Sequence, residues 1–503
     1  MSCRLLMHGV VLGARRWSSR TAKNGVARHA LRNIVETQCV DVDVDGLQGV
    51  CITEIEGRRR AIFVPGALPG AILRVAIDED ADDDRVASSK EKKRKKLMYG
   101  TIVEVLKEHD GKTEPRCEHF GTCGGCSLQE VAYEQQLQIK VARVRNAFER
   151  IAGLKGSHAA LSGLQITGSP MAYNYRNRVE FSCREDRCLG KHRRGSKDIV
   201  EIRGCALQSE VADRCYASIL EHGFGGLVDD VRVEYVTIRE SASSGDVLVN
   251  VVTRTRADAS LGPLAEHLSR SCPSLRGVVN SVLEGDSPVE LRRVAAEYVV
   301  WGVGFVEERL GECVYKVSPN AFFQVNTAVA ESLYRAVVDA AAVRPTDVVL
   351  DLYCGSGTIG LFLAKHSETP PARILGIEVA DGSITDARHN AERNGVDCAT
   401  FVRGDVGDVQ RIAHGAGEGF ARPDVIVCDP ARAGLSKRAL EGILSLEPRT
   451  LVYVSCNVST QARDCKRLVE SGQYAVDRVQ CFDMYPMTTH VESVCTLKLQ
   501  AND

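Results

Sequence analysis

Three short motifs in the C-terminal third of the 503-residue chain contain side chains that could carry out covalent chemistry. Cys456 lies in Ser-Cys-Asn, Asp429 opens Asp-Pro-Ala-Arg-Ala-Gly, and Glu492 ends His-Val-Glu. A thiol beside carboxylates can act as a nucleophile next to a general acid or base. A cysteine is also a small hydrophobe that packs well in a core. With 19 cysteines in the chain, that simpler role is the alternative for any one of them.

A glycine-rich segment upstream, Asp351-Leu-Tyr-Cys-Gly-Ser-Gly-Thr-Ile-Gly, follows an apolar run and opens a helical pattern. Its glycines would let a ligand and the next helix approach the strand closely. Glu378, Asp405 and Asp429 lie at the ends of the next three predicted strands. Acids at three successive strand ends, without a phosphate-loop signature, favour a nucleoside-containing cofactor such as S-adenosylmethionine. Their number disfavours the alternative, in which they only cap ordinary turns.

A cysteine motif lies nearer the N-terminus, in Cys117-x5-Cys123-Gly-Gly-Cys126. Three thiols within ten residues, joined by a fourth ligand elsewhere, suit either a four-iron cluster or zinc. His119 keeps zinc open on spacing alone. The two glycines allow the tight turn that a shared metal site needs.

The elements that must position these residues fall into three regions. Residues 35–110 contain short β-branched runs between glycine and proline turns, which predicts a small β-barrel of the oligonucleotide-binding type. Residues 111–320 hold the cysteine motif, one helical segment at about 128–152 and mixed short strands. From residue 321 to 503, strands alternate with helices, which predicts an open α/β sheet that binds ligands at the carboxyl ends of its strands.

Overall charge gives no support for nucleic-acid binding, because 64 Lys and Arg stand against 66 Asp and Glu. Any such surface must therefore be local. The segments 173–181 and 191–197 are basic with interleaved aromatic residues and are the candidates, whereas the basic run 90–96 is predicted to be a solvated loop. No run approaches the roughly 18 apolar residues of a membrane span, which excludes a transmembrane protein.

The first 34 residues contain several arginines and serines but no acid, since the first acidic residue is Glu36. This composition is typical of organelle transit peptides and predicts a mitochondrial protein. The alternative is a disordered basic tail on a cytoplasmic protein.

Five segments together carry a resemblance to a known family: SPNAFFQVN, DLYCGSGTIG, CDPARAG, VSCNVSTQARD and DMYPMTTHVE. In this order they resemble the RNA uracil-5-methyltransferases of the RumA/TrmA type, from about residue 40 to the C-terminus. The resemblance implies a class I, Rossmann-like methyltransferase domain that uses S-adenosylmethionine. It also implies a target base that leaves its stack, which puts RNA contact at 173–181 and 191–197 ahead of a merely solvated surface.

The resemblance assigns roles to individual residues. Cys456 would be the nucleophile that adds to C6 of uracil, and Glu492 would accept the C5 proton. Asp429 and Arg432 would position this base and the methyl donor. Thr358 stands where relatives often have Asn, which puts its cofactor contact in doubt. The residues that would contact the cofactor are Gln324, Tyr353, Glu378, Asp405 and Asp429.

The cysteine motif resembles that of the family members that contain an iron–sulfur cluster. This implies a [4Fe-4S] cluster in a central RNA-binding domain, with Cys183 and Cys188 as lower-ranked rivals for the fourth ligand. The barrel resembles the TRAM domain of the same members, and the two features together favour ribosomal RNA over tRNA as substrate. The implied ligands are Cys117, Cys123, Cys126 and Cys205.

Two other functions stay open. Cytosine-5 methyltransferases use related chemistry, but their fourth-strand motif carries a cysteine after the proline, whereas Cys428 precedes Asp429 here. A catalytically silent RNA-binding assembly factor is disfavoured because Cys456, Glu492 and Gln324 are present together with Asp429. A monomer without a membrane partner is expected.

Overall fold

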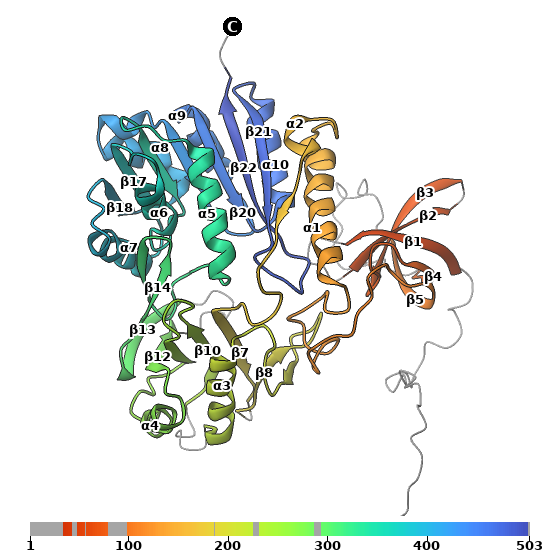
Figure 1. Cartoon of the computed structure of the whole chain (residues 1–503), viewed down its shortest axis with the longest axis horizontal. Helices are drawn as coiled ribbons and strands as arrows, with labels where there is room; N and C mark the ends of the chain where they lie inside the picture. Colours follow the sequence, from red (N-terminus) through yellow and green to blue (C-terminus); the bar gives the residue numbers. More distant parts are fainter. Residues whose placement is uncertain are drawn as a thin grey trace, which may run out of the picture.

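Three groups of elements follow one another along the chain in this computed structural model: a barrel, a central sheet with two helices, and a larger C-terminal sheet between helices (Figure 1). The predicted transit peptide, apart from its last residue, and the basic run 90–96 lie outside the described residues. The structure describes residues 34–42, 48–55, 57–78, 98–185, 187–224, 231–285 and 293–500.

Five N-terminal strands form a closed barrel in the order β1-β2-β3-β5-β4, which confirms the barrel predicted for this region. Ile62 and Val64 of β3 are fully buried in its core, as alternation along a half-buried strand requires. Gly100 of β5 permits a close approach of strands, since a Cβ there would lie 2.4 Å from Cγ1 of Val75. The strands are β1 (Ile34–Val42), β2 (Gln48–Ile55), β3 (Arg58–Pro65), β4 (Ile72–Ile77) and β5 (Met98–Lys107).

The central sheet has seven strands in the order β13-β12-β11-β10-β7-β8-β9. Its middle strands β10 and β11 are buried along nearly their whole length, and the edge strand β13 alternates between exposed and half-buried residues. Helices α3 (Glu210–His222) and α4 (Gly262–Ser271) share a core with this sheet. The strands are β7 (Arg178–Cys183), β8 (Leu189–His192), β9 (Ile199–Glu201), β10 (Val233–Glu240), β11 (Val247–Thr253), β12 (Leu275–Leu283) and β13 (Val294–Gly302).

The C-terminal sheet has the order β18-β17-β16-β19-β20-β22-β21-β6, and only β22 runs antiparallel to its neighbours. The predicted open α/β sheet is confirmed. Its strands are continuous apolar runs because helices cover both faces. The strands are β6 (Ile166–Thr167), β16 (Val348–Leu352), β17 (Arg373–Glu378), β18 (Ala399–Arg403), β19 (Val425–Cys428), β20 (Thr450–Ser455), β21 (Tyr474–Phe482) and β22 (Glu492–Leu499).

The helices divide between the two faces of this sheet. Those packed on one face are α5 (Thr327–Ala341), α6 (Thr358–His366) and α7 (Asp381–Arg393), next to the hairpin β14 (Val306–Leu310) and β15 (Cys313–Val317). Those on the other face are α8 (Val409–Gly415), α9 (Lys437–Leu446) and α10 (Val458–Glu470).

One segment from the middle of the chain belongs structurally to the C-terminal sheet. Helix α1 (Tyr133–Ala147) stands beside α10, and Val144 and Phe148 share the core of that face with Leu468 (Figure 1). After the short α2 (Ala159–Ser162), β6 (Ile166–Thr167) pairs in parallel with β21 at the edge of the sheet. The predicted division at residue 320 stays a prediction, but α1 and β6 tie the two regions together.

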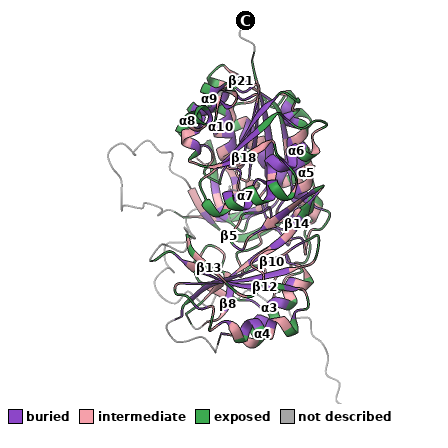
Figure 2. Cartoon of the chain, turned by 90° about the vertical axis from the view of Figure 1, so that its left-hand side faces the viewer, coloured by how far each residue is buried: buried purple, intermediate pink, exposed green. Residues whose placement is uncertain are grey.

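Figure 2 shows buried residues along the strands of the central and C-terminal sheets, with exposed residues mostly on helix surfaces and loops. Across the described residues, no helix is both long and apolar enough to cross a membrane.

Candidate active site

The carboxyl ends of five parallel strands, β16 to β20, meet at one edge of the C-terminal sheet, and a predicted site residue ends or follows each of them. Neighbouring strands are hydrogen-bonded in the order β18-β17-β16-β19-β20, so their ends lie side by side. The structure therefore gathers residues that are up to 103 positions apart in sequence. In that strand order they are Asp405, Glu378, Tyr353, Asp429 and Cys456.

The glycine-rich turn after β16 is held by an acid from the next strand. One carboxylate oxygen of Glu378, Oε2, accepts a hydrogen bond from the Gly355 N–H at 3.3 Å, and Oε1 accepts from two further backbone N–H groups. Tyr353 has φ of +60°, a left-handed conformation that non-glycine residues rarely adopt. Such strained residues are common where a loop holds a ligand. The turn is thus fixed before any ligand binds.

Hydrogen bonds also fix the side chains of two other residues discussed in the sequence analysis, Asp405 and Thr358. Asp405 is exposed, and its Oδ1 accepts a hydrogen bond from the Gly407 N–H at 2.7 Å. Its charge contributes, after burial, to raising the pKa of the Tyr353 hydroxyl. The Oγ1 of Thr358 lies 3.2 Å from the Tyr334 hydroxyl, which donates to it. The hydroxyl of Thr358 is therefore already engaged by a helix α5 residue.

Cys456, Asp429 and Glu492 share one electrostatic environment. Burial first, and then the charges of Glu492 and Asp429, raise the pKa of the Cys456 thiol to about 12, whereas Arg432 lowers it. Burial and Asp429 raise the pKa of Glu492 to about 8, while a hydrogen bond from Tyr485 lowers it. Burial raises the pKa of Asp429 to about 7. The residues that the sequence proposed as nucleophile and base are therefore brought together.

The Arg432 segment is anchored to the start of helix α10. Asn457, directly after Cys456, caps this helix with its Oδ1, and its Nδ2 donates to the carbonyl of Arg432 at 3.1 Å. The Thr460 hydroxyl donates to the same carbonyl at 3.1 Å. The cap that starts α10 thus also fixes the Asp-Pro-Ala-Arg turn beside the thiol.

Tyr485 is a site residue that the sequence analysis missed. Tyr485 is half-buried, and its hydroxyl interacts with Glu492 and Cys456; burial followed by these charges raises its pKa well above the ordinary value. The guanidinium of Arg176 lies 5.9 Å from the centre of the Tyr485 ring, a distance that allows a cation–π contact. The only sequence signal was its place in DMYPMTTHVE, seven residues before Glu492.

A cavity lies between the cysteine motif and the central sheet. Its lining includes Cys117, Cys123, Cys126 and Cys205, together with the basic residue Lys191. Burial, together with the charge of Cys205, raises the pKa of the Cys126 thiol to about 12, whereas a hydrogen bond with Gln129 lowers it. The structure therefore brings together the four cysteines that the family resemblance implied. Of the rival ligands, Cys183 and Cys188 are not part of this lining.

The spacing of the groups around this cavity does not suit a single bound ion. Among the described residues, no three or more His, Cys, Asp or Glu side chains form a group that could hold one metal ion. His119 is also engaged, because its Nε2 accepts a hydrogen bond from the Arg203 N–H at 3.1 Å. Zinc would need its ligands about 2.3 Å from one centre. The [4Fe-4S] cluster therefore stays a prediction.

Comparisons with known proteins agree with this geometry. Residues 291–500 match the family model described as tRNA (Uracil-5-)-methyltransferase. An uncharacterized RNA methyltransferase of Chlorobaculum tepidum is 33% identical over 82% of this chain and 89% of its own. An uncharacterized RNA methyltransferase of Caldanaerobacter subterraneus subsp. tengcongensis is 34% identical, and the match covers 82% of this chain and 91% of that protein. The chain belongs to the RNA uracil-5-methyltransferase family.

The fold of this RNA uracil-5-methyltransferase also has a solved counterpart. The Pyrococcus abyssi tRNA (uracil-54, C5)-methyltransferase, in complex with S-adenosyl-L-homocysteine, is 26% identical with a TM-score of 0.64. The match covers 92% of this chain and 100% of that one. The methyltransferase fold and the use of S-adenosylmethionine on an RNA substrate are thereby established.

Three buried acceptor atoms in the C-terminal region suit this cofactor. Within the described part of the chain, Oε1 of Gln324, Oδ1 of Asp351 and Oε2 of Glu492 are buried without a hydrogen-bond partner. Buried polar atoms are normally paired, so unpaired acceptors point to missing donors. S-adenosylmethionine offers an ammonium group and ribose hydroxyls. Burial raises the pKa of Asp351 to about 7, and this residue was not among the predicted contacts.

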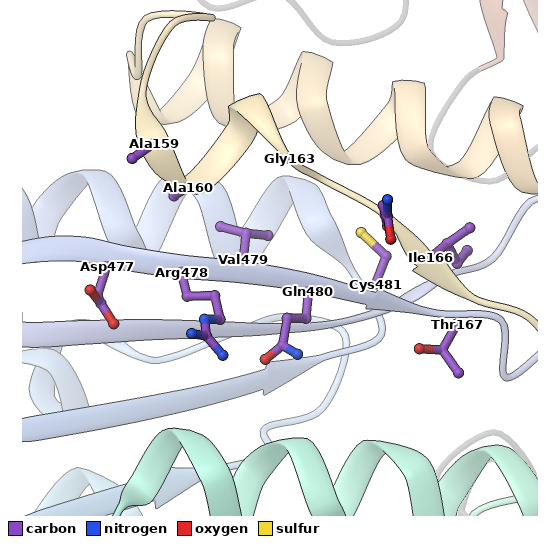
Figure 3. Close-up of a pocket in the computed structure, with 11 residues that line it drawn as sticks. Ala159, Ala160, Gly163, Ile166, Thr167, Asp477, Arg478, Val479, Gln480 and Cys481 are labelled. Atoms are coloured by element: carbon purple, nitrogen blue, oxygen red, sulfur yellow. The ribbon is translucent and has the colours of Figure 1, made fainter.

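Two nearby features of the methyltransferase domain take no part in this site. Cys428 is fully buried in the core under the sheet, so its thiol cannot serve as the nucleophile. A hollow lies beside β21 and β6, the last two strands in the order of the sheet (Figure 3). It is lined by Asp477, Arg478 and Gln480 of β21 and by residues of β6. It contains none of the predicted site residues.

Proposed function

We propose that this enzyme forms 5-methyluridine through a covalent intermediate on Cys456, with Glu492 as the acceptor of the C5 proton. The observation that carries the proposal is the shared environment of Cys456, Glu492 and Asp429 beside the glycine-rich turn. S-adenosylmethionine would supply the methyl group from that turn, held by Gln324, Tyr353 and the acids at the strand ends.

The reaction needs a nucleophile because C5 of uracil does not attack a methyl group by itself. The Cys456 thiolate adds to C6, and the displaced electron pair moves into the enolate, which makes C5 nucleophilic. C5 then takes the methyl group, and S-adenosylhomocysteine leaves. Glu492 removes the C5 proton, the C5–C6 double bond re-forms, and the thiolate is expelled.

The charges around the thiol fit both halves of this cycle. Addition is helped when Glu492 is protonated, since one negative charge less then faces the forming thiolate, and Arg432 favours the thiolate directly. Elimination needs the carboxylate of Glu492. A pKa of about 8 makes both forms accessible near neutral pH.

Asp429→Asn is expected to move the pH dependence of product formation. Because the Asp429 charge raises the pKa of Glu492, its removal lowers that pKa and makes the carboxylate form available at lower pH. The rising limb of the rate–pH profile should shift down by about one pH unit. Single-turnover rates between pH 5 and 9 would measure this shift. The position of the rising limb is compared between the variant and the wild-type enzyme, and the maximal rate is not. An unshifted limb would contradict the assignment of Glu492 as the base.

RNA contact is proposed for the two basic segments of the central region. Lys191, Arg193 and Arg194 line a surface hollow together with Gly124 and Gly125 of the cysteine motif. Basic side chains of this kind bind phosphate groups. The target base, once flipped out of its stack, would reach Cys456 at the edge of the C-terminal sheet. The four cysteines would hold a [4Fe-4S] cluster, whose role here is to stabilise the fold of this region.

Ribosomal RNA is the proposed acceptor, on the strength of the barrel, taken as a TRAM domain, and the four cysteines together. A tRNA acceptor is the second candidate, because the solved relative is named as a tRNA enzyme and matches over its whole length. Residues 1–34 would direct the protein to mitochondria, where it would act as a monomer.

The experiment uses anaerobically purified protein, radiolabelled S-adenosylmethionine and mitochondrial RNA separated into rRNA and tRNA. Label in 5-methyluridine from rRNA supports both the reaction and the acceptor. Label in 5-methyluridine from tRNA supports the reaction and shows that tRNA is the acceptor in place of rRNA. Label in 5-methylcytidine, or none from fully loaded protein, would overturn the reaction.

A further inference from the structure

A stripe of buried polar side chains runs along one face of helix α1. Gln136, Lys140 and Arg143 are spaced by four and three residues, so they lie on the same side of the helix. Their exposed fractions are 0%, 0% and 7%. Residues of these types are rarely buried unless they are paired. The polar stripe of α1, as this set is called below, must therefore have partners.

The partners are in the loop at residues 483–491, which joins β21 to β22 and ends directly before Glu492. Gln136 Oε1 accepts from the Met487 N–H at 2.9 Å. Lys140 forms a buried ion pair with Asp483 and donates to the Tyr485 carbonyl at 3.0 Å.

Arg143 completes the pattern by donating to the carbonyl of Thr489. The polar stripe thus reaches every second residue of the loop from 483 to 489. No other described element makes such a series of contacts to this loop along one face.

The backbone of Met487 adopts an unfavourable conformation, which indicates that surrounding contacts hold the loop in place. Its φ is +65°, a conformation that costs a non-glycine residue free energy and persists only where surrounding contacts enforce it. Its carbonyl accepts from Ser127 N–H at 2.9 Å and Leu128 N–H at 3.0 Å. Gln136 Nε2 donates to the carbonyl of Leu128 at 3.0 Å.

The same contacts reach the cysteine cavity. Ser127 and Leu128 directly follow Cys126, and Ser127 Oγ accepts from the Thr489 N–H at 3.2 Å. Cys126 and Cys205 also pack against the small hydrophobic cluster that contains Met487. The cysteine segment, the polar stripe and the 483–491 loop therefore form one hydrogen-bonded unit.

We infer that Gln136, Lys140 and Arg143 are positioning residues for proton removal: they fix the 483–491 loop, which presents Tyr485 and Glu492 to the substrate. The inference rests on the proposed function for the role of Glu492. The stripe touches neither substrate nor cofactor, so its effect on the reaction is indirect.

Gln136→Leu in the full chain tests this inference. It removes the bond to Met487 and leaves the carbonyls of Leu128 and Val131 without their donor. Asn280→Leu is the matched control, because this fully buried amide also bonds three partners, in the central sheet away from the loop. Both variants should lose similar stability.

The first readout is hydrogen exchange of peptides that cover 483–491, without RNA. Exchange should rise about tenfold in Gln136→Leu and stay at the wild-type rate in Asn280→Leu. The second is the fraction of enzyme trapped as covalent RNA adduct in a single turnover. It should rise in Gln136→Leu, because proton removal slows while S-adenosylmethionine binding is unchanged.

Exchange that stays at the wild-type rate in Gln136→Leu, or rises equally in the control, overturns the inference. So does faster exchange without a change in the adduct fraction of an active enzyme. A wild-type protein that makes no 5-methyluridine would instead refute the proposed function, and the exchange data would still decide whether the stripe holds the loop.

Discussion

Cys456→Ala is expected to abolish 5-methyluridine formation, with a loss of about 10⁴-fold or more in rate. Without the thiol, no bond forms at C6, and C5 keeps the weak nucleophilicity of free uracil. The side chain is small and only half-buried, so its removal leaves little cavity and should cost little stability. Transfer of label from S-adenosylmethionine to RNA in a single turnover measures the loss.

Cys398→Ala is the matched control, since Cys398 is equally half-buried in the same domain and packs against the hydrophobic core just before β18. It should methylate RNA at the wild-type rate. Cofactor affinity, measured by calorimetry, should be unchanged in both variants, which separates lost chemistry from lost binding. Methylation by Cys456→Ala at the normal rate would refute the covalent mechanism.

The order of elements at the catalytic edge could be predicted because it rests on local signals. Apolar runs followed by Gly, Glu or Asp mark the ends of parallel strands, and such ends always share one edge. Glu378, Asp429 and Cys456 were placed together on this basis. The gathering of Cys205 with the other cysteines, some 80 residues earlier, rested on the family resemblance instead, because no local pattern links it to them.

The parts that escaped prediction depend on contacts between distant segments. Nothing in the short apolar run at Ile166 indicates that it extends a sheet formed mostly by residues beyond 348. Lys140 and Gln136 look like solvent-facing residues of an amphipathic helix, and only the loop that covers them makes their burial possible. Tyr485 was missed for the same reason, since its role follows from where that loop is held.

Glu492→Gln is expected to stop the reaction after methyl transfer and to trap the enzyme on its RNA. The amide cannot take up the C5 proton, whereas addition of Cys456 and methyl transfer do not require the carboxylate. Loss of a positioned base typically costs 10² to 10⁴-fold in rate. Denaturing gels should therefore show a stable protein–RNA adduct that contains the label from S-adenosylmethionine.

Glu308→Gln provides the matched control for this variant. Glu308 is also buried, at 2% exposure, and burial raises its pKa too, but it lies in β14 and bonds the backbone at Ala242. The Glu308→Gln enzyme should methylate RNA through repeated turnovers and should accumulate no covalent protein–RNA adduct. If Glu492→Gln instead released 5-methyluridine normally, another group would have to remove the proton, and Asp429 would be the first candidate because its pKa is raised to about 7 at the same edge. The double variant Asp429→Asn with Glu492→Gln would then restore trapping.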